Sequence, residues 1–243
     1  MANLIIDSGN TAIKMFVFDG GKIVKNMRCN QISEMLPALE KNKVLNNITK
    51  CIISSVSYDQ NLMAKILLPY FKVIPYSKSL TLPIINKYKT PETLGSDRIA
   101  AVVGAAHKYP KRNVLVIDSG TAITYDIVTD RGEYLGGNIS MGLNTRFKAL
   151  HNFTERLPLL QCDKSENSLF GTNTTEAMTI GIQNGMLYEI ETTIEKFRSK
   201  FDSLLVIFTG GDSIFFEDKI KNCNFAEPYL VAFGLNEILE CNA

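Results

Sequence analysis

Two short stretches of the sequence place a carboxylate, a hydroxyl group and a glycine directly after an apolar run. They are Asp7-Ser8-Gly9-Asn10-Thr11 and Asp118-Ser119-Gly120-Thr121. A carboxylate suits a cation, and backbone amides with little side-chain cover suit a phosphate. One Asp-Ser-Gly alone is typical of an ordinary hairpin turn. Two copies that share the apolar run, the acid, the glycine and a returning strand predict two similar half-domains that face one nucleotide.

The first stretch, which continues through Ala12 and Ile13 to Lys14, carries the groups that a nucleotide phosphate needs. Gly9 permits close approach of the backbone to a phosphate, and Lys14 adds positive charge. Asp7 could hold Mg²⁺, directly or through water, so that the ion bridges nucleotide phosphates. The stretch is no P-loop, because it lacks the G-x-x-x-x-G-K-[ST] pattern and precedes a strand. Further hydrogen-bond donors are Ser8, Asn10 and Thr11.

The second stretch has no lysine, so Asp118 suits a cation better than direct phosphate contact, while Thr121 can donate to a phosphate oxygen. A third glycine-containing turn, Thr209-Gly210-Gly211, follows another predicted strand. Glycine leaves the backbone uncovered, so this turn could lie under a purine or a ribose. It could equally be an ordinary connection from strand to helix, and spacing alone favours neither.

Asp97 and Arg98 lie at the start of a predicted helix. An Asp in this position is commonly an N-cap or a partner of the helix dipole. Its alternative role is a general base that takes a proton from a substrate hydroxyl during phosphoryl transfer, with Arg98 binding a carboxylate or phosphate. Tyr88 is either a loop anchor or a ligand contact. Thr174 is expected to be the N-cap of the longest helix, where its hydroxyl can also meet a ligand.

The elements that must position these residues form two similar series, each with a meander of three strands and alternating helices and strands. Residues 77–94 and 153–171 connect elements without a regular pattern. Gly181 and Gly185 inside the longest helix predict the close approach of another helix. The first series has strands near 3–7, 12–18, 22–28, 51–56 and 72–75 and helices near 31–43, where Pro37 can delay the start, and 59–70, followed by a helix near 95–109. The second has strands near 113–118, 122–129, 133–139 and 204–208 and helices near 142–151, 174–200 and 229–240.

Composition narrows the class of protein. A hydrophobic content of 45% fits an ordinary globular core, and a net charge of +1 favours neither a nucleic-acid nor a membrane partner. No apolar run approaches the roughly 20 residues of a membrane helix, and no signal-peptide pattern follows Met1, so we expect a cytoplasmic protein. The five cysteines form no Cys-x-x-Cys pair, which favours reduced thiols over disulfides or a zinc site.

Five motifs, in this order and spread over nearly the whole chain, resemble those of the type III pantothenate kinases, members of the acetate and sugar kinase, Hsp70 and actin superfamily. The chain departs from the family at Met141, where proline is usual. The resemblance implies an α/β fold with two ribonuclease H-like (actin-like) halves, 1–112 and 113–243, the second with a long dimerisation helix. Each half is a mixed sheet that starts with an antiparallel meander and is flanked by helices. The motifs are Asp7-Ser8-Gly9-Asn10-Thr11 with Lys14, Gly95-Ser96-Asp97-Arg98, Asp118-Ser119-Gly120-Thr121-Ala122 with Thr124, Tyr134-Leu135-Gly136-Gly137 and Gly171-Thr172-Asn173-Thr174.

The resemblance also implies ATP-dependent phosphorylation of pantothenate at its terminal hydroxyl, the first step towards coenzyme A. Residues 7–14 and Thr121 would then contact ATP, Asp97 would accept the proton, and Asp118 would bind a monovalent cation, K⁺ or NH₄⁺. A homodimer is implied, in which Thr174 can reach the site of the partner subunit. The implied pantothenate contacts are Tyr88, Gly95, Ser96, Asp97, Arg98 and Thr174.

Two alternatives remain at this stage. The chain could be a kinase of the same superfamily for a sugar or another carboxylate, which a substrate panel would distinguish. It could also be a nucleotide-binding regulatory protein, because some relatives of these kinases are described as accessory factors for transcription. The presence of Asp97 and Lys14 favours catalysis over the regulatory alternative.

Overall fold

The computed structural model describes residues 2–9, 11–216, 219–220 and 225–243, which form two compact units. The first unit comprises Met1–Pro110, Gly132–Tyr134 and Leu230–Ala243, and the second comprises Lys111–Arg131 and Leu135–Tyr229. A single division between residues 112 and 113 does not account for the C-terminal segment, which packs in the first unit. Among the described helices, none combines the length and apolar character that a membrane crossing requires.

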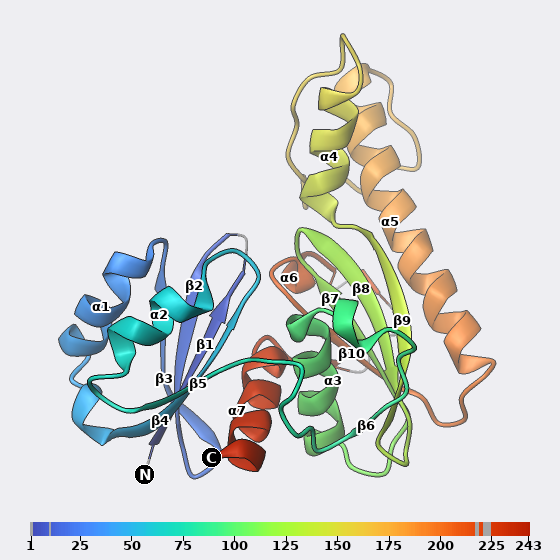
Figure 1. The fold of residues 1–243 in the computed structure, drawn as a ribbon. Coiled ribbons are helices and arrows are strands. Elements are labelled where there is room, and N and C mark those ends of the chain that lie inside the picture. Colours follow the sequence, from blue (N-terminus) through green and yellow to red (C-terminus); the bar gives the residue numbers. More distant parts are fainter. Residues whose placement is uncertain (1, 10, 217–218, 221–224) are drawn as a thin grey trace. The chain divides into compact units, whose positions relative to one another are not determined.

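A mixed five-stranded sheet forms the centre of the first unit, drawn in blue and cyan in Figure 1. The strand order is β3-β2-β1-β4-β5. β1 pairs antiparallel with β2 and parallel with β4, so the N-terminal strand lies in the middle of the sheet. β2 and β3 complete the predicted meander. The strands are β1 (Ala2–Ser8), β2 (Ile13–Asp19), β3 (Lys22–Cys29), β4 (Ile48–Ser55) and β5 (Lys72–Pro75).

Two pairs of helices pack in the first unit. α1 and α2 contribute to an apolar core with β1, β2 and β4. α7 packs against β1 and β4 and, more extensively, against α3. The helices are α1 (Met35–Lys41), α2 (Gln60–Leu67), α3 (Ser96–Lys108) and α7 (Leu230–Asn242), with 3₁₀ turns at Ile32–Glu34, Leu45–Asn47 and Pro91–Thr93.

The alternation of side chains along β1 decides which way its acid points. Leu4 and Ile6 belong to the core that α1 and α2 share. Asn3 lies on the opposite face, where its side chain bonds to Asn236 of α7. Successive strand residues alternate between faces, so Asp7 shares the face of Asn3. The acid therefore lies on the side of the sheet that α7 covers.

The sheet of the second unit repeats this arrangement. β7 pairs antiparallel with β8 and parallel with β10, as β1 does with β2 and β4. The strand order is β11-β10-β7-β8-β9. The first residues of β9, Glu133 and Tyr134, belong to the first unit, where they pair with β6 (Ile85–Asn86). The strands are β7 (Val114–Ser119), β8 (Ala122–Val128), β9 (Glu133–Met141), β10 (Leu205–Thr209) and β11 (Phe225–Ala226).

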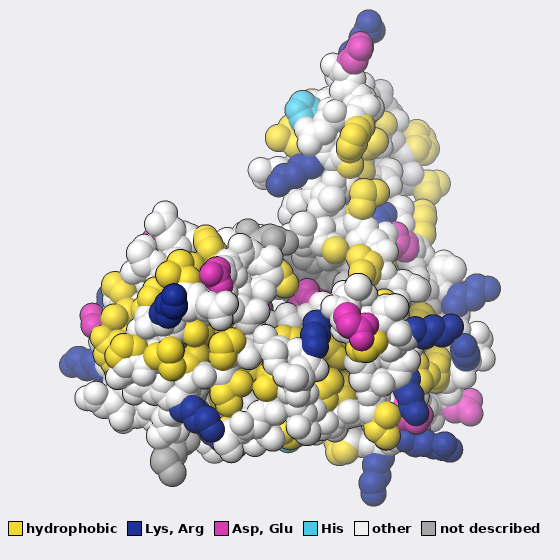
Figure 2. All heavy atoms as spheres, in the orientation of Figure 1, with side chains coloured by type: hydrophobic (Ala, Val, Ile, Leu, Met, Phe, Trp, Pro, Cys, Tyr) yellow, Lys and Arg dark blue, Asp and Glu magenta, His cyan; other side chains and the backbone are white. Residues whose placement is uncertain are grey.

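Helices α4 (Leu143–Asn152) and α5 (Thr174–Arg198) cover one face of this sheet, and α6 (Ser213–Phe216) follows β10. Leu115 and Ile117 of β7 pack in one core with residues of α4 and α5, so Asp118 points to the opposite face. Figure 2 shows apolar side chains exposed over the part formed by α4, α5 and their connection. They include Leu150, Phe153, Leu159, Leu169 and Phe170.

Helix α7 is tied to the first unit by a glycine crossing and by a polar network. A Cβ on Gly104 of α3 would lie 2.3 Å from the carbonyl oxygen of Leu230, and one on Gly234 would lie 1.7 Å from that of Ala100. Only glycine therefore permits this approach of the two helices. His107 of α3 and Glu237 of α7 add an ion pair at 3.0 Å, which is charged when the imidazole is protonated.

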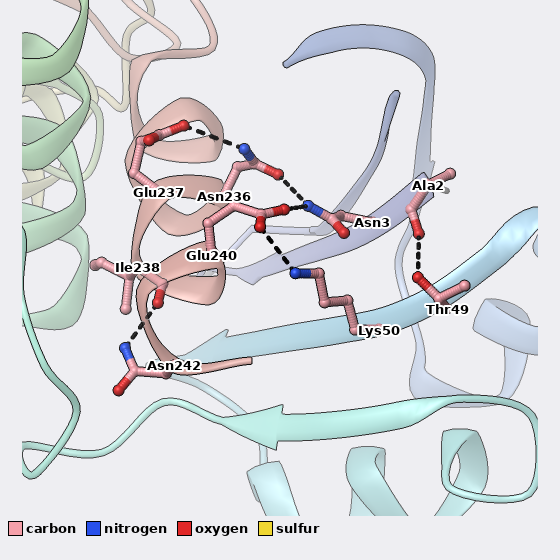
Figure 3. Close-up of polar contacts among 9 residues, drawn as sticks. All are labelled: Ala2, Asn3, Thr49, Lys50, Asn236, Glu237, Ile238, Glu240 and Asn242. Carbon is pink, nitrogen blue, oxygen red and sulfur yellow. Dashed lines mark hydrogen bonds and ion pairs between the residues drawn. The ribbon is translucent and has the colours of Figure 1, made fainter. Parts of the chain in front are cut away.

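The polar network joins α7 to β1 and β4 (Figure 3). The Asn3 side-chain amide donates to Asn236 at 2.8 Å and to Glu240 at 2.6 Å. Lys50 of β4 bonds to the second oxygen of Glu240 at 2.8 Å. Asn3 and Asn236 are both buried, so these bonds satisfy polar groups that water does not reach. The network holds the strand that carries Asp7 against α7.

The predicted elements agree with the observed ones, with local differences. The first helix begins at Met35, after a 3₁₀ turn, so Pro37 lies in its first turn, where proline is tolerated. The two-residue strands β6 and β11 and the four-residue helix α6 were not predicted, because such short elements have no periodic pattern. Gly181 and Gly185 lie next to open space, so among the described residues no other helix approaches them closely.

Candidate functional site

The first acidic turn lies between β1 and β2. Asp7 is the penultimate residue of β1 and pairs with Lys14 on β2 and Ser54 on β4. The Gly9 amide donates to the carbonyl of Ala12 at 3.2 Å, which closes the turn. Ile13 and Ala12 are buried, Thr11 and Lys14 are exposed, and Asn10 lies outside the described residues.

Ser57, in the loop after β4, supports this turn from the side. Its hydroxyl donates to the Gly9 carbonyl at 2.9 Å and lies 3.1 Å from the Ser8 hydroxyl. The Val56 amide donates to the Ser8 carbonyl at 3.0 Å. Sequence analysis did not identify Ser57, because it lies 48 residues from Gly9 and reaches it only through the parallel pairing of β1 with β4.

The carboxyl group of Asp7 is perturbed by its surroundings. Burial raises its pKa from 3.8 to about 6, with Lys14 acting to lower it and Asp97 to raise it. A nearby cation would stabilise the ionised form of a carboxyl group whose pKa is raised by burial. The influence of Asp97 also shows that the structure brings these two predicted acids close together within the first unit.

Asp97 lies in the first turn of α3, but it is not the N-cap. Gly95 occupies the N-cap position, and Asp97 accepts the amide hydrogen of Arg98 at 2.8 Å. A Cβ on Gly95 would lie 2.4 Å from Asp97 Oδ1, so the carboxylate folds back over this glycine. Asp97 is exposed, which leaves it accessible to a substrate hydroxyl. The geometry thus fits both the helix-dipole interpretation and the general-base interpretation.

The strand β4 holds the start of α3. The hydroxyl of Ser54 donates to that of Ser96 at 2.9 Å. Ser54 also pairs with Asp7 across the sheet. The first residue of α3 is therefore bonded to the strand beside Asp7, which explains why a small hydroxyl residue precedes Asp97.

Arg98 and Tyr88 act together through an aromatic stack. The guanidinium carbon of Arg98 lies 5.6 Å from the centre of the Tyr88 ring. Tyr88 stacks on Tyr134, with ring centres 6.0 Å apart and an interplanar angle of 7°. Arg98 and Tyr134 are buried. Tyr88 is therefore a support for Arg98, which agrees with the anchor interpretation, and its contact with a ligand stays a prediction.

The second acidic turn lies between β7 and β8. Asp118 pairs with Thr124 on β8 and Thr209 on β10, and the Gly120 amide donates to Ala122 at 2.9 Å. Gly210 has a φ of +93°, and a Cβ there would lie 2.4 Å from Asp118 Oδ1. The Thr-Gly-Gly turn therefore packs directly beside this carboxylate, and a function under a purine or ribose stays a prediction.

Asp212, which follows β10, is an acid beside the second turn that sequence analysis did not single out. Its amide donates to the Ser119 carbonyl at 3.0 Å, and the Ser119 hydroxyl lies 3.4 Å from its carboxylate. Burial raises the pKa of Asp212, while its bonds to Ser119 and to the Leu143 amide lower it. Asp212 thus joins β7, β10 and the start of α4.

The start of α4 also fixes Thr121. The Thr145 hydroxyl donates to the Thr121 carbonyl at 2.6 Å, and the Gly142 amide does so at 3.1 Å. A Cβ on Gly142 would lie 1.9 Å from the Gly120 carbonyl, so glycine is required next to this turn. Thr121 is itself exposed, and Met141, where the chain departs from the motif, is exposed as well.

Thr174 is not the N-cap of α5, contrary to the prediction. Asn173 is the cap, because its side-chain oxygen accepts the Glu176 amide hydrogen at 3.0 Å. Thr174 is the first helical residue and is exposed. It lines a cavity of about 530 Å³ between α4 and α5, together with Arg146, Leu150, Leu157, Ala177, Met178, Gly181 and Ile182.

The described residues contain no group of three or more His, Cys, Asp or Glu side chains that could hold a metal ion. Any Mg²⁺ would therefore need ligands beyond these side chains, such as phosphate oxygens and water. The four described cysteines, Cys29, Cys51, Cys162 and Cys241, are unpaired with one another, and Cys223 lies outside the described residues.

Comparison with known proteins decides the family. The model of the type III pantothenate kinase family matches residues 3–196. A type III pantothenate kinase of Christiangramia forsetii is 42% identical over 242 residues, 99% of this chain and 98% of the relative. One of Bacteroides fragilis is 41% identical over 241 residues, again 99% and 98%. The chain belongs to the type III pantothenate kinase family.

Solved structures show that this member of the pantothenate kinase family has the predicted actin-like fold. A Campylobacter jejuni protein described as a Baf-family transcriptional activator matches with a TM-score of 0.62 and 22% identity, over 98% of this chain and 97% of that one. A Streptomyces griseus glucokinase of the ROK family, solved with glucose and AMPPNP, matches with a TM-score of 0.56 and 10% identity, over 99% of both. At these identities the likeness concerns the fold alone.

The structure shows which contacts several residues of the family motifs make. Tyr134 of Tyr134-Leu135-Gly136-Gly137 supports Tyr88, and a Cβ on Gly137 would lie 1.9 Å from the Tyr125 carbonyl. Gly171 likewise leaves no room for a side chain, since a Cβ would lie 2.2 Å from the Ala177 amide nitrogen. Two glycines of the family motifs, Gly137 and Gly171, are therefore required by close packing.

Proposed function

We propose that this protein transfers the γ-phosphoryl group of ATP to the terminal hydroxyl of pantothenate, forming 4′-phosphopantothenate and ADP in the first step of coenzyme A biosynthesis. The observation that carries the proposal is nearly full-length similarity to type III pantothenate kinases, at 42% identity, in a chain with accessible Asp97 beside Asp7. A kinase needs a phosphate-binding turn and a base, and we assign these roles to residues 7–14 and to Asp97 of the first unit.

Each residue has one role in the proposed reaction. Residues 7–14 hold the ATP phosphates, with Asp7 supporting a magnesium ion that neutralises their charge. The hydroxyl oxygen of pantothenate attacks the γ-phosphorus, the bond to the β–γ bridging oxygen breaks, and Asp97 accepts the hydroxyl proton. Arg98, held by Tyr88, binds the pantothenate carboxylate. Gly95 and Ser96 shape the start of α3 around the acceptor.

The second unit supplies the remaining contacts. Thr121 contacts ATP, and Asp118 binds a monovalent cation, K⁺ or NH₄⁺. The packing around Gly210 supports the cation site. Both the Asp118 carboxylate and the Ser119 carbonyl oxygen lie close to Gly210, so two kinds of oxygen are near the same turn. Carboxylate and carbonyl oxygens are ligands that hard cations prefer.

We also propose a homodimer in which α5 faces its copy. The open space beside Gly181 and Gly185 and the exposed apolar side chains around α4 and α5 support this arrangement. Exposed apolar patches commonly mark protein interfaces. Thr174, at the exposed start of α5, would then contact pantothenate bound in the partner subunit.

A coupled assay of ADP release tests the proposal. We expect release in Mg²⁺ and K⁺ that depends on pantothenate, and little release with glucose, N-acetylmannosamine or acetate. ADP release that rises with a sugar and not with pantothenate would favour another kinase of the superfamily. Nucleotide binding without turnover of any acceptor would favour a regulatory protein.

A further inference from the structure

Lys78 bridges the two ends of the long connector between β5 and α3. The connector begins at Tyr76, whose amide donates to the Ile53 carbonyl of β4 at 2.7 Å. The ammonium group of Lys78 donates to the Leu94 carbonyl, at the far end of the connector, and lies 5.7 Å from the centre of the Tyr76 ring. One side chain thus joins a point fixed on the sheet to the residue before the N-cap of α3.

The bond of Lys78 lies next to the Asp97 carboxylate. Its acceptor belongs to the peptide group that joins Leu94 to Gly95, and the carboxylate of Asp97 folds back over Gly95. Partial burial lowers the pKa of Lys78, while the negative charges of Asp97 and Glu92 act to raise it. Asp97 therefore lies within electrostatic reach of the ammonium group.

Lys78 also completes a pattern of charges in the first unit. Asp7 lies opposite Lys14 in the β1–β2 pair, and the two interact favourably. The negative charge of Asp97 acts to raise the pKa of Asp7. A second cation beside Asp97 offsets the repulsion between the two acids. Asp7 and Asp97 then each have a lysine near them.

We propose that Lys78 is a positioning residue for the acceptor side of the reaction: it fixes the peptide group that leads into Gly95, the residue over which the Asp97 carboxylate folds, and it offsets the negative charge there. The inference rests on the proposed role of Asp97 as proton acceptor. A solvent-exposed lysine usually contributes little to stability. The residue as a whole is exposed although its ammonium group is partly buried, so we expect its effect mainly in turnover.

Three substitutions separate the bond from the charge. Lys78→Met removes both, Lys78→Gln keeps a hydrogen-bond donor without the charge, and Lys78→Arg keeps both. Lys72→Met, at an exposed lysine on neighbouring β5, is the matched control. For each variant we would measure kcat, the KM values for ATP and pantothenate, and the melting temperature.

We expect Lys78→Met to lower kcat about tenfold, because Asp97 loses the nearby positive charge, and an electrostatic change equivalent to one pKa unit is a factor of ten. Lys78→Gln should fall between Lys78→Met and Lys78→Arg, and Lys78→Arg should stay near the original rate. The KM for ATP and the melting temperature should stay unchanged throughout, as should every parameter of Lys72→Met.

Two results would overturn the inference. One is a kcat of Lys78→Met equal to that of Lys72→Met. The other is a loss in all three Lys78 variants that runs parallel to a lower melting temperature, which would indicate a structural role only. If the original protein shows no ADP release dependent on pantothenate, the proposed function fails instead, so the two failures are distinguishable.

Discussion

The two acidic turns occupy equivalent places in their sheets but have different surroundings. Each acid is the penultimate residue of a central strand and points away from the main apolar core of its unit. Four residues separate the paired Ser8 and Ile13, whereas three separate Ser119 and Ile123. Both turns have a second acid nearby, Asp97 for the first and Asp212 for the second, but only Asp7 lies opposite a lysine, whereas Asp118 packs against Gly210. We therefore propose different roles for the two turns, a phosphate with its metal at the first and a monovalent cation at the second.

The largest expected effect concerns Asp97, the exposed acid near the first turn. Asp97→Asn should lower kcat about 10²- to 10⁴-fold, the typical contribution of general-base catalysis. ATP affinity, measured by calorimetry, should stay nearly unchanged. Arg98 Nα–H can still bond to the amide oxygen, so the helix start should persist. An unchanged kcat would reject the base assignment.

The packing of the second turn is tested by Gly210→Ala. The positive φ and the 2.3 Å approach to the Ser119 carbonyl should together cost about 2–4 kcal/mol in the free energy of unfolding. Urea unfolding measures this cost. Gly120→Ala is the matched control, because nothing lies within 4 Å of its Cβ position. Equal stabilities of the two variants would show that the close packing of Gly210 beside the second turn is not required.

The burial of the first acid predicts a dependence of stability on pH. The folded-state pKa of Asp7, about 6, exceeds the unfolded value of 3.8, so ionisation destabilises the folded protein as the pH rises through 6. Without nucleotide and magnesium, Asp7→Asn should therefore raise the free energy of unfolding at pH 8 by about 1–3 kcal/mol. The gain should shrink by pH 5. An equal gain in stability at pH 8 and at pH 5 would show that it does not come from the ionisation of Asp7.

The smallest expected effect concerns the cation of the second turn. Replacing K⁺ by Na⁺ should lower kcat a few-fold in the original protein. In Asp118→Asn the two salts should give equal rates, because the carboxylate that distinguishes the site is gone. The same salt dependence in Asp118→Asn and in the original protein would place the cation elsewhere.

Sequence patterns captured the long elements and the motif-bearing turns, because periodic apolar residues fix strands and helices locally. They could not capture contacts that arise from tertiary pairing. Ser57 reaches Gly9 only because β1 pairs with β4, and Asp212 reaches Ser119 only because β10 pairs with β7. The cap of α5 was misassigned by one residue, since Asn173 and Thr174 are both good caps.

The crossing of α3 and α7 at Gly104 and Gly234 has a consequence for synthesis of the chain. The helix that bears Asp97 lacks its main packing partner until residues 230–243 have left the ribosome, although β1 to β5 emerge much earlier. The surfaces of α3, β1 and β4 that α7 covers therefore stay exposed while the whole second unit is translated. Nascent chains released before residue 230 should be recognised by chaperones and proteases as unfinished.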